Sequence, residues 1–349
     1  MVDSVLAVRL RSGQGLGNQL FTVISGFGLA TKRGVPLEIA GIDSYKLQRL
    51  KLRFNEAFLS KCRHQYISMD LPVGYDSIVY ERVGYMREGS SYRLNSEFDV
   101  GLLHTRGRCL VEGHLQSKQY WDIPELRPEN IFLNPDSVFE RECTPPDTAV
   151  INIRGGEYVG NSFLLPAEFW EFGMELLHHD GYRKFLIVSD DRYYVESLLN
   201  TSRMRSFGEA RIFDGDLLSH VGIIATAKTI LISNSTFPVP LLRIFNKDAV
   251  VYAPNYWTGY NQSIWSPCFS VVDDFLYIDH RLRSVTLGST IEVSSLDASN
   301  EDPRALGIGV LPSRGRLIID SLARLKRRFT TSLLARITKF GFRIGRPKR

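Results

Sequence analysis

The sequence predicts an α/β protein built from two Rossmann-like halves, and three observations support this prediction. An apolar run, a glycine-rich turn and a helical pattern follow one another near the amino end. Beyond residue 147, apolar runs and helical patterns alternate regularly. Between these regions, the proline pair in Cys143-Thr-Pro-Pro-Asp147 marks a boundary. Strands that alternate with helices of this length form parallel, doubly wound sheets.

The amino-terminal elements are expected in the order strand, turn, helix and strand. Residues 5–10 form the apolar run of the first strand, and helical spacing covers 18–32 until Gly34 ends it. Residues 37–40 then form the second strand, so a right-handed connection is expected between the two. Residues 41–110 show few clean periods and yield no assignment.

The second half shows a clearer alternation. Strands are expected at 149–153, 185–188, 229–233 and 249–252, with a short edge strand opening at 212. Helices are expected at 166–179, 193–200, 217–227 and 240–245. Ligands of such sheets bind at the carboxyl ends of the strands, where the strand order reverses.

Charge is distributed unevenly along the chain. The 349 residues carry a net charge of +5, yet residues 313–349 hold 12 Lys or Arg and one acid. The rest has 31 basic and 37 acidic residues, so it is acidic overall. This balance argues against a nucleic-acid binder.

The cysteines and the amino end predict a cytosolic protein. Four cysteines are too widely spaced for a zinc cluster or a redox pair, and we interpret them as reduced structural thiols. The run at 5–10 has no basic flank, so no signal peptide is expected. No window reaches the roughly 18 uncharged apolar residues that a spanning helix needs.

The first candidate site is the glycine-rich segment Gly13-Gln-Gly-Leu-Gly17-Asn18. It departs from a dinucleotide fingerprint because Asn18 stands where the third glycine belongs. Glycines at a strand-to-helix turn still allow backbone N–H groups to approach a negatively charged ligand. The alternative is a tight turn that Asn18 caps.

The second candidate is Ile151-Asn-Ile-Arg-Gly-Gly-Glu-Tyr158, where Arg154 leaves a buried strand just before two glycines. A guanidinium at that place directs a planar set of donors toward the ligand edge of the sheet, which suits a diphosphate. The alternative is a surface arginine that pairs with Glu157.

Polar side chains follow two further strands. Asp190 and Asp191 could accept hydrogen bonds from guanine or from ribose hydroxyls, or Asp191 could cap the next helix. The segment Ser233-Asn-Ser-Thr-Phe237 precedes a helix near Pro238 and could bind phosphate or act as a cap.

A third acidic pair, Asp214-Gly-Asp216, has the form that holds a divalent ion in some sugar-nucleotide transferases. Two carboxylates make an incomplete shell for Mg²⁺, and Asp216 stands where a helix cap belongs. We therefore favour capping.

In this order the motifs resemble the bacterial α-1,2-fucosyltransferases of glycosyltransferase family 11. The resemblance covers roughly residues 5 to 260 and rests on Gln14-Gly-Leu-Gly-Asn-Gln-Leu-Phe21, Gly113-His-Leu-Gln-Ser-Lys-Gln-Tyr120, Asn152-Ile-Arg-Gly-Gly-Glu-Tyr158, Leu165-Pro-Ala-Glu-Phe169, Ser189-Asp-Asp191, Ser233-Asn-Ser-Thr-Phe237 and Val251-Tyr-Ala-Pro254 with Trp257. It implies two Rossmann-like domains facing a cleft (the GT-B type), a GDP-fucose donor, inversion at the anomeric carbon and neither metal nor other cofactor.

The resemblance also implies roles for individual residues. Arg154 would hold the donor diphosphate, Ser235 and Thr236 would assist it, and Asp190 or Asp191 would read guanosine. Asn18 with Gln19 would lie across the cleft near the sugar and the acceptor. The full donor-binding set comprises Gly15, Gly17, Asn18, Gln19, Asn152, Arg154, Asp190, Asp191, Ser233, Asn234, Ser235 and Thr236.

The family pattern differs from this chain at several positions: its first loop glycine is Gln14 here, and its S-W-W after Ser-Thr-Phe is Pro238-Val-Pro240. Its histidine, second arginine and aspartate are replaced here by Asn152, Gly155 and Glu157. Loss of one cation could remove a charge-assisted bond of roughly 1.5 to 3 kcal/mol. We assign Glu157 as the general base, since direct displacement with inversion needs one; a carboxylate that only orients Arg154 is the alternative.

The carboxyl end predicts a membrane contact. Residues 285–312 are expected to be a flexible polar linker, and apolar residues at steps of three or four in 313–349 predict a basic amphipathic helix. Such a helix suits an anionic membrane surface, although it could instead pack on the acidic body.

The sequence therefore predicts four segments: an acceptor-side domain at 1–146, a nucleotide-sugar domain at 147–284, the linker and the tail. The predicted function is transfer of fucose to a galactose-type hydroxyl of a surface polysaccharide precursor, at the inner face of the cytoplasmic membrane. A transferase that uses another nucleotide sugar and a non-catalytic glycan-binding protein of the same fold are the alternatives.

Overall fold

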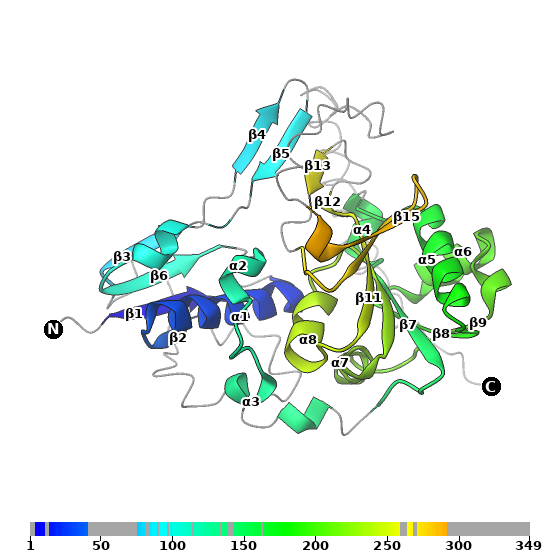
Figure 1. Ribbon diagram of the computed structural model, residues 1–349, viewed down its shortest axis with the longest axis horizontal. Coiled ribbons are helices and arrows are strands. Elements are labelled where there is room, and N and C mark those ends of the chain that lie inside the picture. The colour runs from blue at the N-terminus through cyan, green and yellow to red at the C-terminus, as the bar shows by residue number, and fades with distance from the viewer. Residues whose placement is uncertain are drawn as a thin grey trace, which may run out of the picture. The chain divides into compact units, whose positions relative to one another are not determined.

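The protein is described by a computed structural model, shown in Figure 1. It describes residues 4–10, 14–40, 75–80, 84–88, 91–95, 98, 100–113, 115–132, 135–138, 142–161, 163–258, 264–267 and 271–291. The chain divides into two units, Met1–Gly309 and Val310–Arg349. All described residues belong to the first unit, so the predicted amphipathic tail lies outside them.

The first sheet is entirely parallel and has the strand order β2-β1-β6-β3. Its strands are β1 (Val5–Arg9), β2 (Leu37–Ala40), β3 (Ser77–Tyr80) and β6 (Arg108–Glu112). The helix α1 (Leu16–Arg33) connects β1 to β2, which confirms the predicted β-α-β unit. The strand order reverses between β1 and β6.

The helix α1 ends where the sequence predicts. Gly34 has a φ of 64°, and its N–H donates to the carbonyl oxygen of Thr31 at 3.1 Å. Only a residue without a Cβ adopts that left-handed conformation freely, so glycine is a favourable helix terminator. On the buried face, a Cβ at Gly28 would overlap the backbone of Tyr120, which lies in the short helix α2 (Lys118–Trp121).

The second sheet has the order β15-β14-β11-β10-β7-β8-β9, and every neighbouring pair is parallel except β14 and β15. Its strands are β7 (Thr148–Ile153), β8 (Lys184–Ser189), β9 (Glu209–Ile212), β10 (Thr229–Ile232), β11 (Val250–Pro254), β14 (Leu276–Asp279) and β15 (Ser284–Leu287). The chain runs outward from β7 through β8 to β9 and then crosses back to β10. The predicted α/β fold with two doubly wound parallel sheets is confirmed.

Helices cover both faces of this second sheet. Alternate side chains of β7 point to opposite faces, so Ile151 packs with residues of α5 (Ala167–His179) and α6 (Arg192–Thr201), whereas Val150 packs with residues of α7 (Leu217–Thr226) and α8 (Pro238–Phe245). A shorter helix of this half, α4 (Glu157–Asn161), follows β7 after three residues.

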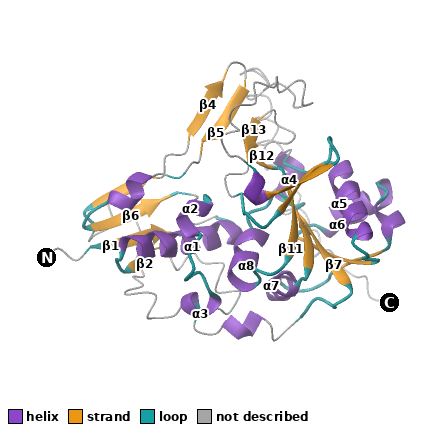
Figure 2. Cartoon of the chain, in the orientation of Figure 1, coloured by secondary structure: helices purple, strands orange, loops and turns teal. Residues whose placement is uncertain are grey.

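A small third sheet and several short turns complete the description (Figure 2). The third sheet has the order β12-β13-β5-β4, formed by β4 (Gly84–Glu88), β5 (Ser91–Asn95), β12 (Tyr256–Thr258) and β13 (Ile264–Pro267). The short helices are η3 (Val100–His104), α3 (Pro128–Ile131), η4 (Pro135–Val138), η5 (Met204–Phe207) and η6 (Gly288–Thr290).

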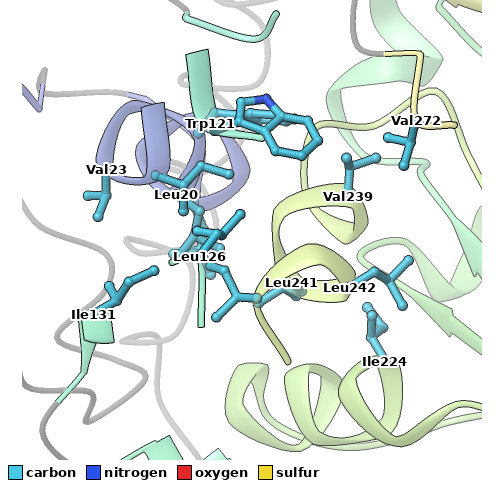
Figure 3. Close-up of a cluster of buried hydrophobic side chains, with 14 of the residues drawn as sticks. Leu20, Val23, Trp121, Leu126, Ile131, Ile224, Val239, Leu241, Leu242 and Val272 are labelled. Atoms are coloured by element: carbon cyan, nitrogen blue, oxygen red, sulfur yellow. The ribbon is translucent and has the colours of Figure 1, made fainter. Parts of the chain in front are cut away.

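One hydrophobic core joins elements from both halves of the sequence (Figure 3). Leu20 of α1 and Trp121 of α2 belong to the same buried cluster as Leu241 and Leu242 of α8. Removal of this much apolar surface from water is the main force that holds these elements together. The division into domains at residues 146 and 147 stays a prediction.

Most element boundaries agree with the predictions within two residues, but two differ by more. The edge strand was expected to open at 212, but β9 ends there, because the N–H of Glu209 already donates to the carbonyl oxygen of Arg183 at 2.8 Å. The linker was expected from 285, but β15 pairs with β14 over 284–287, and the described residues continue to 291. Among the described residues, no helix has the length and apolar character of a transmembrane span.

Candidate functional site

The carboxyl ends of three neighbouring strands meet where the order of the second sheet reverses. The register pairs Asn152 of β7 with Ile232 of β10, and Ile153 of β7 with Ser189 of β8. Arg154, Asp190 and Ser233 therefore follow their strands at the same edge. This is the edge at which ligands of doubly wound sheets bind, so the structure brings together the residues that the sequence singled out.

Arg154 is shared between two carboxylates. Its Nη1 lies 2.6 Å from Oδ2 of Asp190, and its Nη2 donates to Oε1 of Glu157 at 3.0 Å. The guanidinium also lies over the ring of Tyr158, 5.4 Å from the centroid, and the side chain is 30% exposed. The alternative, a pairing with Glu157, is thus present at the ligand edge of the sheet, and binding of a diphosphate by Arg154 stays a prediction.

Asp190 and Asp191 also bind the turn that follows β7. Oδ1 of Asp190 accepts from the N–H of Gly155 at 2.9 Å, and Oδ2 of Asp191 accepts from the N–H of Gly156 at 3.1 Å. The other oxygen of Asp191 accepts from the N–H of Tyr194 at 3.0 Å, which confirms that Asp191 caps α6. Both carboxylates are engaged within the protein, and their reading of guanosine stays a prediction.

The glycine pair after Arg154 is required by these contacts. A Cβ at Gly155 would lie 2.5 Å from Cβ of Asp191, far inside contact distance. Gly156 has a φ of 44° and would place a Cβ against the carboxylate of Asp190. The second arginine of the resembled family therefore has no room at position 155 unless the two strand ends move apart.

Several of the predicted donor-binding residues are buried and bond to the protein itself. Oγ of Ser233 donates to Oδ1 of Asn152 at 3.2 Å, and Nδ2 of Asn234 donates to the carbonyl oxygen of Phe163 at 3.0 Å. Ser233, Asn152 and Asn234 are 1%, 5% and 2% exposed. The first bond joins the end of β7 to the residue after β10, and the second joins the turn after β10 to the segment after α4. Direct contact of these side chains with a donor stays a prediction.

The start of α8 offers fewer amide donors than an ordinary helix. Its first and third residues, Pro238 and Pro240, have no N–H, and the N–H of Phe237 donates to Oγ of Ser235 at 3.3 Å. An anion at this helix start would depend on the hydroxyl groups of Ser235 and Thr236 and on the amides of the turn. That requirement fits Ser235 and Thr236, the two hydroxyl residues of the motif that lie next to the helix start.

The glycine-rich segment near the amino end reaches this same turn. Gly17 lies so close to the backbone of Thr236 that a Cβ would overlap its carbonyl group. Gly15 is the exposed N-cap of α1, so the expectation that Asn18 caps this helix is wrong. Oδ1 of Asn18 instead accepts from Nε2 of Gln116 at 3.2 Å. This bond joins the glycine-rich segment to the motif at residues 113–120.

Gln19 occupies a different environment from its neighbours. It lies in the first turns of α1 and is fully buried. A buried amide of this kind belongs to the hydrogen-bonded interior, so contact with the sugar or acceptor would need a route past other side chains. That Gln19 lies near the sugar and the acceptor stays a prediction.

The pair Asp214 and Asp216 does not form a metal centre with its described neighbours. Oδ1 of Asp216 accepts from both N–H and Oγ of Ser219 at 2.8 Å, which confirms that it caps α7. Asp214 is 91% exposed and lies 3.6 Å from Nη1 of Arg192. No group of three or more potential metal-binding side chains occurs within the described ranges.

Sequence reasoning missed the role of Tyr158. Its hydroxyl group donates to the carbonyl oxygen of Asn234 at 3.3 Å, so the side chain bridges the turns after β7 and β10. Burial raises the pKa of Tyr158, which is opposed by the charge of Arg154. The signal was present, since this tyrosine belongs to the motif that contains Arg154.

His220 is a second titratable group near this edge that the sequence did not single out. Its ring centroid lies 5.5 Å from that of Phe213. Burial lowers its pKa, against the attraction of Asp216, Asp190 and Asp214. The imidazole is therefore biased toward its neutral form.

No protein-family model and no curated protein matches the chain. Solved structures that resemble it include a mutant of Arabidopsis thaliana FUT1 in complex with GDP, at 12% identity and a TM-score of 0.45, covering 83% of this chain and 80% of that one. POFUT1 in complex with GDP-fucose has 9% identity and a TM-score of 0.35, with coverages of 71% and 95%.

A further similar structure is the glycosyl transferase family 9 protein from Veillonella parvula DSM 2008. It has 10% identity and a TM-score of 0.39, covering 94% of this chain and 98% of that one. All three TM-scores lie below 0.5, so the function has to be argued from the residues of this chain.

Proposed function

We propose that this chain is an inverting glycosyltransferase of the GT-B type that moves L-fucose from GDP-fucose to a galactose-type hydroxyl, in α-1,2 linkage. The acceptor would be a precursor of a surface polysaccharide or O-antigen. The observation that carries this proposal is Arg154, a partly exposed guanidinium at the point where the strand order of the second sheet reverses. We choose GDP-fucose as the donor because the motifs resemble, in the same order, those of the α-1,2-fucosyltransferases.

The proposed chemistry follows from the charge of the leaving group. GDP leaves as an anion, and donors placed in advance where negative charge develops lower the barrier. Arg154 would bind the diphosphate, and the hydroxyl groups of Ser235 and Thr236 would contact the phosphate oxygens. We propose that this arrangement works without a metal ion, which activity in the presence of a chelator would test.

The proposed general base is Glu157. Its carboxylate is 67% exposed and stands in the first turn of α4, so an acceptor hydroxyl can reach it from solvent. Inversion by direct displacement requires that hydroxyl to lose its proton, and a carboxylate within hydrogen-bond reach can accept it. Orientation of Arg154 through their ion pair is the other role open to this residue.

The proposal is tested by incubation of the full chain with GDP-fucose and a galactoside. Release of free GDP together with a fucosylated product is the expected result, and an Arg154→Ala variant serves as the control for contaminating activity. Failure to form product with any galactoside, while GDP binds, would favour the non-catalytic glycan-binding alternative.

A different sugar nucleotide is the second candidate, because Gly155 leaves no room for the second arginine of the fucosyltransferase motif. Calorimetric titration with GDP, UDP and dTDP distinguishes a GDP-fucose transferase from a transferase that uses another sugar nucleotide. We expect heat of binding with GDP alone. Tighter binding of UDP or dTDP would exclude the fucose assignment.

We further propose that residues 313–349 bring the enzyme to the inner face of the cytoplasmic membrane. Their basic amphipathic pattern would place the catalytic unit beside a lipid-carried glycan acceptor. Deletion of 313–349 should move the protein from the membrane fraction to the soluble fraction, while the activity toward a soluble galactoside persists. Unchanged partitioning would refute this proposal.

A further inference from the structure

The charges around Arg154 conflict with direct binding of a diphosphate. One guanidinium is paired with two carboxylates, those of Asp190 and Glu157, so the ion-paired group as it stands is net negative. A diphosphate carries at least two negative charges of its own. Like charges at these distances repel, so a carboxylate has to leave Arg154 before phosphate oxygens can take its place.

The two carboxylates differ in how firmly they are held. Asp190 is 34% exposed, and both of its oxygens are engaged, one by Arg154 and the other by the N–H of Gly155. Glu157 is 67% exposed and has a longer contact of 3.0 Å with Arg154, three residues away along the chain. Exposed ion pairs of this second kind contribute little to stability and exchange easily.

We propose that Asp190 is a positioning residue that stays bound to Arg154, and that Glu157 is an exchangeable counter-ion which the diphosphate displaces. The proposal rests on the proposed function, because it assumes that Arg154 is the diphosphate site. In the free protein Glu157 fills the place of the phosphate. When the donor binds, Glu157 moves away and Asp190 keeps one edge of the guanidinium fixed, so the other edge faces the ligand.

This arrangement predicts opposite effects for two isosteric substitutions. Glu157→Gln removes the competing charge, so pyrophosphate and GDP should bind about two- to fivefold more tightly. Asp190→Asn retains an acceptor for the N–H of Gly155 but loses the ion pair with Arg154. The guanidinium should then rotate faster about its Nε–Cζ bond in the unliganded protein, whereas Glu157→Gln should leave that rotation slow.

The experiment combines calorimetric titration with pyrophosphate and nitrogen-15 relaxation of the Arg154 side chain, assigned with an Arg154→Lys variant. Glu196→Gln is the matched control, since Glu196 is another exposed glutamate, paired at 2.8 Å with Arg192 four residues away. It should change neither the affinity for pyrophosphate nor the motion of Arg154.

Two results would overturn the inference. One is an unchanged affinity for pyrophosphate in Glu157→Gln when the wild-type protein binds it. The other is a guanidinium that Glu157→Gln releases as much as Asp190→Asn does. If neither the wild-type protein nor Glu157→Gln binds pyrophosphate or GDP, the diphosphate site itself is wrong and the proposed function fails with it; the relaxation data then still decide whether Asp190 positions Arg154.

Discussion

The two parallel sheets each carry an arginine and a carboxylate where the strand order reverses, yet the two pairs are built differently. In the first sheet, Nη1 of Arg9 lies 2.6 Å from Oε1 of Glu112, and the two side chains are 23% and 5% exposed. In the second sheet, Arg154 is divided between Asp190 and Glu157, and Glu157 is largely exposed. The same kind of ion pair therefore occurs once with a buried carboxylate and once with an exposed one.

From this difference we expect a structural role for the Arg9 pair and a ligand-binding role for the Arg154 pair. Removal of one partner of a buried ion pair leaves an uncompensated charge, so we expect the pair of Arg9 and Glu112 to hold β1 against β6. An exposed carboxylate loses little when it exchanges one partner for water. We therefore expect Arg154 to accept a new anion and Arg9 to keep its pair with Glu112.

The largest expected effect tests the predicted role of Arg154 in ligand binding. Arg154→Ala removes the guanidinium and should lower the affinity for GDP by about 100-fold, which corresponds to about 3 kcal/mol. Calorimetry measures the affinity, and an unchanged melting temperature shows that the fold is intact. Arg192→Ala is the control, because Arg192 is an arginine of the same sheet edge that pairs with Glu196 and Asp214. A similar loss in both variants would contradict the assignment.

The second effect tests the buried carboxylate of the pair formed by Arg9 and Glu112. Glu112→Ala leaves Arg9 without this carboxylate beneath the surface, so the free energy of unfolding should fall by about 3 kcal/mol, at the lower end for a broken buried pair because Arg9 is partly exposed. Urea denaturation measures it, with Glu196→Ala as an exposed-pair control that should cost under about 0.5 kcal/mol. A loss no larger than that of the control would mean that the two pairs are equivalent.

The third effect tests the close approach of the strand ends behind Arg154. Gly155→Ala places a methyl group against Asp191, so the structure has to shift and the free energy of unfolding should fall by about 1–3 kcal/mol. Thermal denaturation measures the change. A variant as stable as the wild type would show that the turn has space for a side chain at position 155. The arginine of the resembled family's motif could then be introduced there.

The smallest effect concerns Tyr158, which bridges the turns after β7 and β10. Tyr158→Phe removes one hydrogen bond and should lower the free energy of unfolding by about 0.5–1.5 kcal/mol at pH 7. Because burial raises the pKa of Tyr158 above its ordinary value of 10.0, the unfolded chain ionises first and the wild-type protein loses stability as pH rises through about 10.

The phenylalanine variant has no such group, so its stability should fall less over the same interval. Urea denaturation of both proteins at pH 7 and pH 10.5 checks this. A difference in stability that does not narrow at the higher pH would show that the hydroxyl group ionises as freely in the folded protein as in the unfolded one.

Local pattern was sufficient for much of the fold. The helix α1 with its terminator Gly34, and the alternation of β7, α5, β8 and α6, follow from periodicity and turn chemistry. The strand β6 could not be predicted in the same way, because it pairs with β1 and β3 from distant parts of the chain. Its position depends on contacts that no local period records.

The candidate site shows the same limit. Parallel strands align their carboxyl ends, so Arg154, Asp190 and Ser233 could be expected at one edge from the sequence alone. Asp190 forms both an ion pair with Arg154 and a hydrogen bond with the amide of Gly155. These contacts depend on the distance between two neighbouring strand ends, which the sequence does not specify. The burial of Asn152 is likewise a property of the packed sheet.

The most direct test of the central claim is a crystal structure of the protein soaked with GDP. The account predicts that the phosphate oxygens lie within hydrogen-bond distance of the Arg154 guanidinium, with Asp190 still bound to it and Glu157 withdrawn. A nucleotide bound away from Arg154, or a diphosphate that reaches it only through a divalent cation, would contradict the account.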